Sequence, residues 1–202
     1  MPTFNKIIDF NDHVFSTESP ANYHNSDLPL EEGHFAPDFS LTPTNWFLTS
    51  NKKIGFTNIS LKDLYQTPLV IVFYSIYWGQ QGAELLGKLK DIKEVIESDA
   101  NMMIVTAEPK RDIQRSLLSK ELPFFFYHDQ EQQLAGRFGV FSEKRPAWNY
   151  FSGIEKNIPL LSVFVVSQSG LITYRHTEYH SALHAGNLLA AFGKERQLKK
   201  IA

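Results

Sequence analysis

The chain has 202 residues, a formal net charge of −2 and 43% hydrophobic residues, so it is long enough to bury the core of one domain. Acidic and basic side chains are mixed along the sequence, which argues against nucleic acid or an anionic membrane as a partner. The sequence contains no cysteine, and this excludes a thiol nucleophile, a disulfide and a thiolate metal ligand.

The N-terminal stretch does not have the pattern of a signal peptide. It reads MPTFNKIIDFNDHVF, with acidic residues where a signal peptide has a basic flank and an unbroken apolar core. No apolar run is long enough to span a bilayer, so we expect a cytoplasmic protein. Residues 1–33 have no sustained period and are interpreted as an N-terminal arm, followed by one domain over residues 34–202.

The next segments alternate between strand and helix patterns. The apolar run PLVIVFYSI (68–76) predicts a central strand buried on both faces. Leucine and isoleucine then recur at helical spacing, which predicts an amphipathic helix over 79–98. Four shorter elements are predicted to follow in order: a strand at 102–107, a helix at 110–121, a strand at 123–129 and a helical turn at 130–138.

The last third of the chain ends in a hairpin and a helix. Residues 141–160 have turn residues and aromatics but no clear period, which indicates a loop insertion. The strands 160–166 and 171–176 flank the turn SQSG, and a final helix is predicted to start near Ser181. This order predicts an α/β domain with a central mixed sheet flanked by helices. Sites in such sheets lie at the carboxyl ends of the strands, here where 68–76 meets its helix.

Four segments, in order, resemble the peroxiredoxin-like (AhpC/TSA) family of redoxins, which have the thioredoxin fold. They are APDFSL (36–41), ISLKDLYQTPLVIVFY (59–74), LPFFFYHDQEQQLAGRFGV (122–140) and SVFVVSQSGLI (162–172). The resemblance covers roughly residues 34–180 and implies a thioredoxin-like fold. The family's activity is thiol-dependent peroxide reduction, an antioxidant oxidoreductase chemistry.

The resemblance also implies where the family's reactive cysteines would lie. In FYSIYWGQQGAEL (73–85), the first family cysteine, the peroxide-reducing or disulfide-exchanging thiolate, falls on Gly79. The resolving cysteine falls on Gly82. Peroxide reduction needs a thiolate that becomes a sulfenic acid, and glycine has no side chain to ionise. The resemblance therefore predicts a site that has lost the family's thiol chemistry.

Two further positions depart from the family pattern. Three residues before the hairpin phenylalanine Phe164, peroxiredoxins have an arginine and thioredoxins a cis-proline, whereas this chain has Leu161. Three residues before the first cysteine position, where many peroxiredoxins have a hydroxyl, the chain has Ile76. Leucine cannot stabilise a thiolate.

A pocket is nevertheless predicted at the start of the helix. Its candidate residues are Tyr77, Trp78, Gly79, Gln80, Gln81, Gly82 and Leu161. Free N–H groups and the positive end of the helix dipole favour a small anion there, unless the glycines merely permit the turn and water fills the space. Trp148 and Tyr150 of the insertion are candidates for a surface that contacts a partner.

Histidines are clustered in HTEYHSALH, where His180 and His184 are four residues apart. Two metal ligands on one helix face have this spacing, but the segment matches no known zinc signature. A surface histidine cluster is the simpler interpretation. We therefore expect neither a metal nor a cofactor.

These observations favour a non-catalytic binding or scaffolding module over an enzyme. Its partner is an unknown protein or a small anion at the helix start, and self-association as a homodimer is one option. Two alternatives stay open. The chain could be an enzyme that uses the same pocket for non-thiol chemistry with a bound metal or small ligand, or an inactive partner subunit of an active redoxin.

Overall fold

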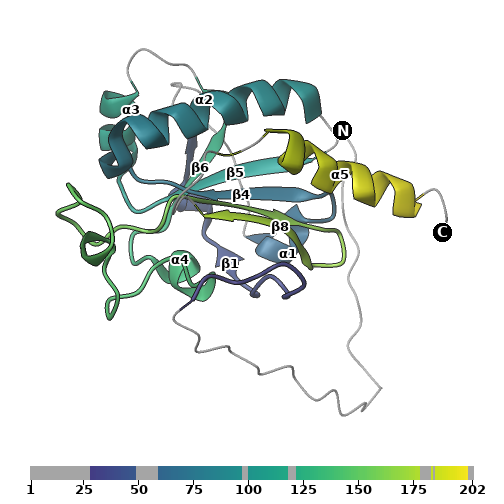
Figure 1. Ribbon diagram of the computed structural model, residues 1–202, viewed down its shortest axis with the longest axis horizontal. Helices are drawn as coiled ribbons and strands as arrows, with labels where there is room; N and C mark the ends of the chain where they lie inside the picture. Colours follow the sequence, from purple (N-terminus) through teal and green to yellow (C-terminus); the bar gives the residue numbers. More distant parts are fainter. Residues whose placement is uncertain are drawn as a thin grey trace, which may run out of the picture.

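The computed structural model describes residues 28–48, 59–96, 100–117, 122–177, 183 and 185–199 (Figure 1). A six-stranded sheet with the order β2-β6-β5-β4-β7-β8 forms its centre. These strands are β2 (Trp46–Leu48), β4 (Leu69–Phe73), β5 (Asn101–Thr106), β6 (Phe125–His128), β7 (Ser162–Val166) and β8 (Ile172–Thr177). The pairs β4–β5 and β5–β6 are parallel, whereas β2, β7 and β8 join antiparallel. The predicted central mixed sheet is thus confirmed.

Helices cover both faces of this sheet. Figure 1 shows α2 and α5 on one side and α1 and α4 on the other. The helices are α1 (Leu61–Leu64), α2 (Gly79–Ile96), α3 (Lys110–Ser116), α4 (Gln133–Arg137) and α5 (Ala185–Lys199). Single 3-10 turns are η1 (Pro43–Asn45), η2 (Ile76–Trp78) and η3 (Ala147–Asn149), and β1 (Ser40–Leu41) pairs with β3 (Ile59–Ser60) as a small separate ribbon.

The strand β4 contributes side chains to two hydrophobic cores, because successive residues of a strand point to opposite faces. Val70 and Val72 pack in the layer of α2 and α5, and Leu69, Ile71 and Phe73 pack in the layer of α1 and α4. All five side chains are fully buried. The predicted two-sided burial of this strand is confirmed.

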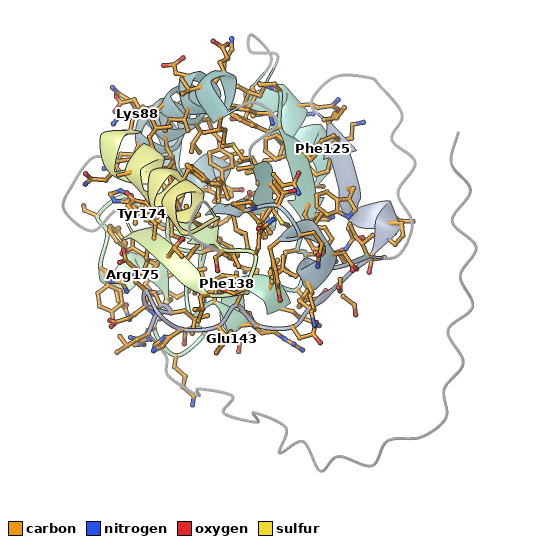
Figure 2. All side chains as sticks on the ribbon, turned by 90° about the vertical axis from the view of Figure 1, so that its right-hand side faces the viewer. Lys88, Phe125, Phe138, Glu143, Tyr174 and Arg175 are labelled. Carbon is orange, nitrogen blue, oxygen red and sulfur yellow. The ribbon has the colours of Figure 1, made fainter. Side chains whose placement is uncertain are left out.

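Side chains fill both layers (Figure 2). Phe138, which follows α4, lies inside its layer and contacts the rings of Phe73 and Phe164, with centroid distances of 5.2 and 5.1 Å. Such offset or edge-to-face pairs add to the stability gained from burial alone. The aromatic cluster therefore holds α4 against the middle of the sheet.

The central strand ends earlier than the apolar run predicts. The run extends to Ile76, but β4 ends at Phe73 and Ile76 begins the turn η2. Ser75 is the N-cap of this turn, and its hydroxyl accepts a hydrogen bond from the N–H of Tyr77 at 3.2 Å. A local serine cap therefore ends the extended conformation, although the following residues remain apolar.

Other predicted boundaries differ by a few residues. The predicted helix over 110–121 is seen as α3, which ends at Ser116, and residues 118–121 lie outside the described residues. The predicted start of the last helix at Ser181 also lies outside them, and α5 is described from Ala185. Among the described residues, no helix is both long and apolar enough to cross a membrane.

The end of the predicted N-terminal arm packs against the domain. Residues 1–27 lie outside the described part of the chain. Leu30 is buried in the layer of α1 and α4, and its N–H donates to the carbonyl oxygen of Phe138 at 3.0 Å. This segment passes so close to Gly139 that a Cβ atom there would lie 2.0 Å from the carbonyl oxygen of Leu28.

Gly139→Ala is therefore expected to destabilise the protein. Gly139 has a φ of +69°, which side chains other than glycine rarely adopt, and its added Cβ would overlap backbone. Together these effects should lower the free energy of unfolding by more than about 2 kcal/mol, measured by urea denaturation.

Gly136→Ala is the matched control, because Gly136 lies in α4, and a Cβ atom there has nothing within 4 Å. Its effect should be neutral or stabilising by up to about 1 kcal/mol. Equal stability of the two variants would contradict the close approach of residues 28–30 to Gly139.

Candidate functional site

The carboxyl end of β4 leads through η2 directly into α2, and Gly79 stands at the junction. Gly79 has a φ of 54° and a ψ of −125°, and its N–H donates to the carbonyl oxygen of Ile76. This N–H is therefore not one of the free N–H groups expected at the start of the helix. The backbone conformation is one that glycine adopts readily and L-residues with a Cβ atom rarely do.

Gly82 lies one turn further along α2 and is buried. A Cβ atom at Gly82 would lie 2.8 Å from Cε2 of Tyr74 and 3.2 Å from Cβ of Trp78. The ring of Tyr74 thus occupies the space that a side chain at position 82 would need. Both positions where the family resemblance places cysteine disfavour a larger residue, Gly79 because of its backbone conformation and Gly82 because of its neighbours.

Leu161 lies in the layer of α2 and α5 and is almost completely buried. It directly precedes β7, whose first residue, Ser162, pairs with Phe73 at the end of β4. Leu161 therefore stands beside the end of the central strand and contributes packing to the core there. Its side chain brings no charge to the site.

A buried carboxylate joins the ends of β4 and β5. The hydroxyl of Ser75 donates to Oε1 of Glu108 at 2.6 Å, and the hydroxyl of Thr106 donates to Oε2 at 2.5 Å. Glu108 is only 7% exposed, so these short, charge-assisted bonds replace the water that the carboxylate loses. The network also caps η2, because Ser75 accepts the N–H of Tyr77.

The sequence analysis did not identify Glu108. A signal was available, since Thr106 lies near the end of the strand predicted over 102–107 and Glu108 directly follows that strand. The carboxyl ends of adjacent parallel strands meet at one edge of a sheet, which places Glu108 near the end of β4. The hydrogen bond to Ser75, which is 33 residues away, became evident only in the folded chain.

Tyr74 is the aromatic residue between β4 and η2, and it is 2% exposed. Burial, and secondarily the negative charge of Glu108, raises the pKa of Tyr74 to about 12. Tyr74 packs in the hydrophobic layer of α2 and is thus a core residue.

The insertion 141–160 folds against η2. Nε1 of Trp78 donates to the carbonyl oxygen of Pro159 at 2.9 Å, and its ring meets Phe151 edge-on at 4.9 Å between centroids. Nζ of Lys156 donates to the hydroxyl of Tyr77 and lies 4.4 Å from the ring centroid. This hydrogen bond raises the pKa of the Lys156 amine, so the insertion brings a cation to the start of α2.

A pocket of about 250 Å³ lies against the first turn of α2. Its lining combines apolar side chains with a phenol, an amide and a hydroxyl: Tyr74, Ile76, Gly79, Gln80, Ala83, Ser116 and Leu117. Of the residues predicted to form a pocket, Gly79 and Gln80 line it. Tyr77 and Gln81 are exposed outside it, and Trp78, Gly82 and Leu161 are buried in the core.

The remaining candidates differ in what the structure says of them. His180 and His184 lie outside the described residues. Within the described part of the chain, no group of three or more His, Asp or Glu side chains is arranged to hold a metal ion. Trp148 and Tyr150 of the insertion are exposed, with 47% and 54% of their surfaces accessible, so both are available for contact.

Comparison with known proteins gives one family and one fold. A sequence model described as the AhpC/TSA family matches residues 33–175. The AhpC of Enterococcus faecalis has a similar structure, with a TM-score of 0.63 at 15% identity, over 84% of this chain and 94% of that one.

Two further structures have the same fold. The reduced 2-Cys peroxiredoxin of Plasmodium vivax has a TM-score of 0.65 at 10% identity, over 85% of each chain. The peroxidoxin BcpB of Mycobacterium tuberculosis has a TM-score of 0.60 at 18% identity, over 83% of this chain and 97% of that one. A search of the curated proteins gives no match.

Gly82→Ala should lower the free energy of unfolding by roughly 1–3 kcal/mol, because the added methyl group overlaps the buried ring of Tyr74. Gly87→Ala in the same helix meets nothing within 4 Å and should be neutral or stabilising by up to about 1 kcal/mol. Urea denaturation of both variants measures the difference. If Gly82→Ala were as stable as Gly87→Ala, the ring would not fill this space.

Tyr74 should make stability pH-dependent in alkali. In the unfolded chain a tyrosine ionises near its ordinary pKa of 10.0, whereas folded Tyr74 stays protonated to about 12. The folded state therefore holds more protons between pH 10 and 12, so its free energy of unfolding falls as the pH rises. Denaturation at several pH values should give a smaller fall for Tyr74→Phe; an unchanged slope would speak against a buried Tyr74 hydroxyl.

Proposed function

The chain belongs to the AhpC/TSA family, and we propose that it is a member without thiol chemistry that acts as a binding module. The observation that carries this proposal is the complete absence of cysteine from the 202 residues. The family's peroxide reduction requires a thiolate as nucleophile, and no other residue type in the chain can be oxidised to a sulfenic acid.

The backbone of the site supports the proposal. Gly79 has a conformation that disfavours any side chain, and the ring of Tyr74 fills the space beside Gly82. A side chain at position 79 would have open space but a strained backbone, and one at position 82 would overlap the ring of Tyr74.

The pocket at the first turn of α2 is the proposed binding site. Its apolar walls and the polar groups of Tyr74, Gln80 and Ser116 suit a small ligand with an apolar body and one polar end. A small anion would also suit this pocket, because the positive end of the α2 dipole lies there.

A protein partner would instead use the exposed aromatic side chains beside the site. Tyr77, Trp148 and Tyr150 are 42%, 47% and 54% exposed, and large aromatic residues are enriched at protein interfaces. The partner could be a second copy of the chain or a cysteine-bearing redoxin in the cytoplasm. Size-exclusion chromatography with light scattering distinguishes a homodimer, and co-purification from the native host reveals another redoxin.

The buried network of Glu108 favours a second candidate, an enzyme with non-thiol chemistry. Glu108 is a carboxylate in a largely dry environment at the end of β5, and Lys156 contributes a cation at the start of α2. Buried carboxylates near a pocket are common in acid–base catalysis. Native mass spectrometry and metal analysis of the purified protein test this candidate, since it expects a bound ligand or metal whose retention depends on Glu108.

The purified protein should not reduce hydrogen peroxide or cumene hydroperoxide with dithiothreitol or a thioredoxin system as reductant. A cysteine-bearing family member such as the AhpC of Enterococcus faecalis serves as positive control in the same assay. Sustained, protein-dependent consumption of peroxide would overturn the proposal.

The same peroxidase assay is repeated with the Gly79→Cys/Gly82→Cys double variant. It restores both thiols, but the backbone at position 79 and the ring of Tyr74 should hold them in unsuitable positions or unfold the local turn. We expect no sustained turnover. Recovery of activity comparable to the positive control would show that only the sulfur atoms are missing.

A further inference from the structure

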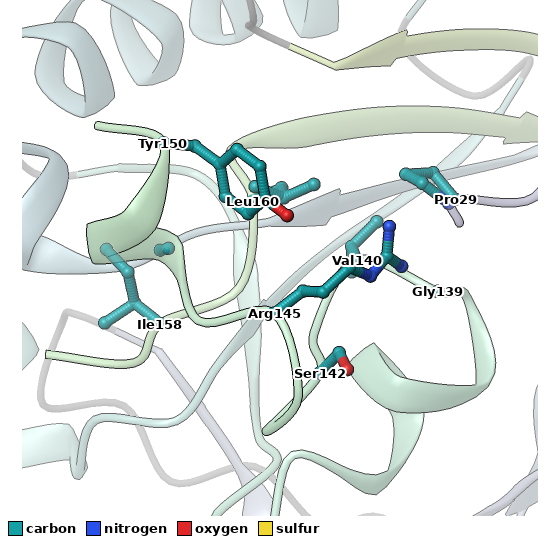
Figure 3. Close-up of a pocket in the computed structure, with 9 residues that line it drawn as sticks. Pro29, Gly139, Val140, Ser142, Arg145, Tyr150, Ile158 and Leu160 are labelled. Atoms are coloured by element: carbon teal, nitrogen blue, oxygen red, sulfur yellow. The ribbon is translucent and has the colours of Figure 1, made fainter. Parts of the chain in front are cut away.

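A second, smaller pocket lies away from the first turn of α2 and shares no lining residue with the pocket there. Three segments form it: the chain at Pro29, the turn after α4, and the insertion (Figure 3). Its lining residues are Pro29, Gly139, Val140, Ser142, Arg145, Ala147, Tyr150, Ile158 and Leu160. The enclosed space is about 20 Å³, room for about one water-sized group, and the rest of the pocket opens to solvent.

Arg145 is the charged residue of this pocket. Figure 3 shows its side chain extending across the pocket toward Val140, with Tyr150 on one side and Ser142 on the other in this view. Nε of Arg145 is buried and has no hydrogen-bond partner, and the ion pairs seen among the described residues do not include Arg145. Burying a donor of a charged group without an acceptor costs free energy. A ligand that supplies an acceptor to Nε of Arg145 would remove this cost.

Several backbone N–H groups around the pocket already have partners. The N–H groups of Gly139, Val140 and Leu160 are bonded to the carbonyl oxygens of Gly136, Ala135 and Val140. The insertion is itself closed by Asn157, whose amide group accepts the N–H of Ala147 at 3.3 Å and donates to the carbonyl oxygen of Ser142 at 3.1 Å. Arg145 is thus presented by a fixed loop, and the guanidinium is the one charged group lining the pocket.

We propose that this pocket binds a carboxylate group, one oxygen of which occupies the enclosed space beside Nε of Arg145, while a short apolar tail lies in the open part of the pocket. A guanidinium offers two parallel N–H donors that match the two oxygens of a planar carboxylate. A phosphate would need donors on more sides, and among the lining side chains only the hydroxyls of Ser142 and Tyr150 add to Arg145. The side chains of Val140, Ile158 and Leu160 provide an apolar wall for the tail.

The carboxylate could belong to a small branched-chain acid or to the C-terminus of a peptide, and both present the same group to Arg145. The pocket shares no lining residue with the pocket at the first turn of α2, so a ligand can be tested at each pocket separately.

Isovalerate is the first probe, titrated into the ¹⁵N-labelled full chain at constant ionic strength. The Nε–H signal of Arg145, assigned by its loss in Arg145→Gln, should shift and saturate, with a dissociation constant on the order of 1 mM. Arg145→Gln should bind at least about tenfold more weakly, because it loses the charge-assisted pair. Arg111→Gln, which changes an exposed arginine paired with Asp112, should bind like the wild type.

Two further variants keep the proposal testable if Arg145→Gln does not fold. Arg145→Lys keeps the charge but not the paired donors and should bind more weakly than the wild type, and Ser142→Ala should weaken binding by several-fold. An unshifted Arg145 signal, equal shifts with chloride, or wild-type binding by Arg145→Gln would each overturn the proposal.

A titration with peptides distinguishes the two possible sources of the carboxylate. A short peptide ending in free leucine should produce the shift of isovalerate, and its C-terminal amide should not. If the free peptide binds more tightly than isovalerate, the site is one for peptide termini. If isovalerate alone binds, the site is one for small acids; both results support carboxylate recognition.

Discussion

The central strand β4 has no side that faces solvent. Its five side chains divide between two hydrophobic layers, so β4 is stable only when α2 and α5 cover one face and α1 and α4 cover the other. The two residues that follow, Tyr74 and Ser75, are buried as well. The chain therefore leaves the sheet through a dry region, where each polar group must find a partner within the protein. The hydroxyl of Ser75 finds Glu108, and this hydrogen bond fixes the turn from which α2 begins.

Where cysteines would stand in the family, the chain has polar contacts that favour stability. Trp78 and Tyr77 attach the insertion to η2, and Glu108 joins the ends of two strands. Residues that position reactive atoms commonly cost stability, because they hold buried charge or strained backbone. Here the buried carboxylate has two hydroxyl donors, so the start of α2 is tied into the framework of the domain. A pocket lies beside it.

The sequence was informative where one local pattern decided the structure. The apolar run of β4, the helical spacing in α2 and the glycine turn between β7 and β8 are such patterns, and each element was found. Three features depended on distant contacts or on backbone choice and were not predictable. The edge strand β2 has three residues and exists because it pairs with β6. Glu108 meets Ser75 only after the strands align, and Gly79 could have taken a helical φ as readily as the positive one it has.

The conformation of Gly79 bears on how easily a thiol could be introduced at this site. A codon change to cysteine at position 79 would place a Cβ atom on a backbone that resists it, and the same change at position 82 would overlap Tyr74. Neither change is favourable by itself, so a pair of thiols at these positions requires accompanying changes in η2 or at Tyr74.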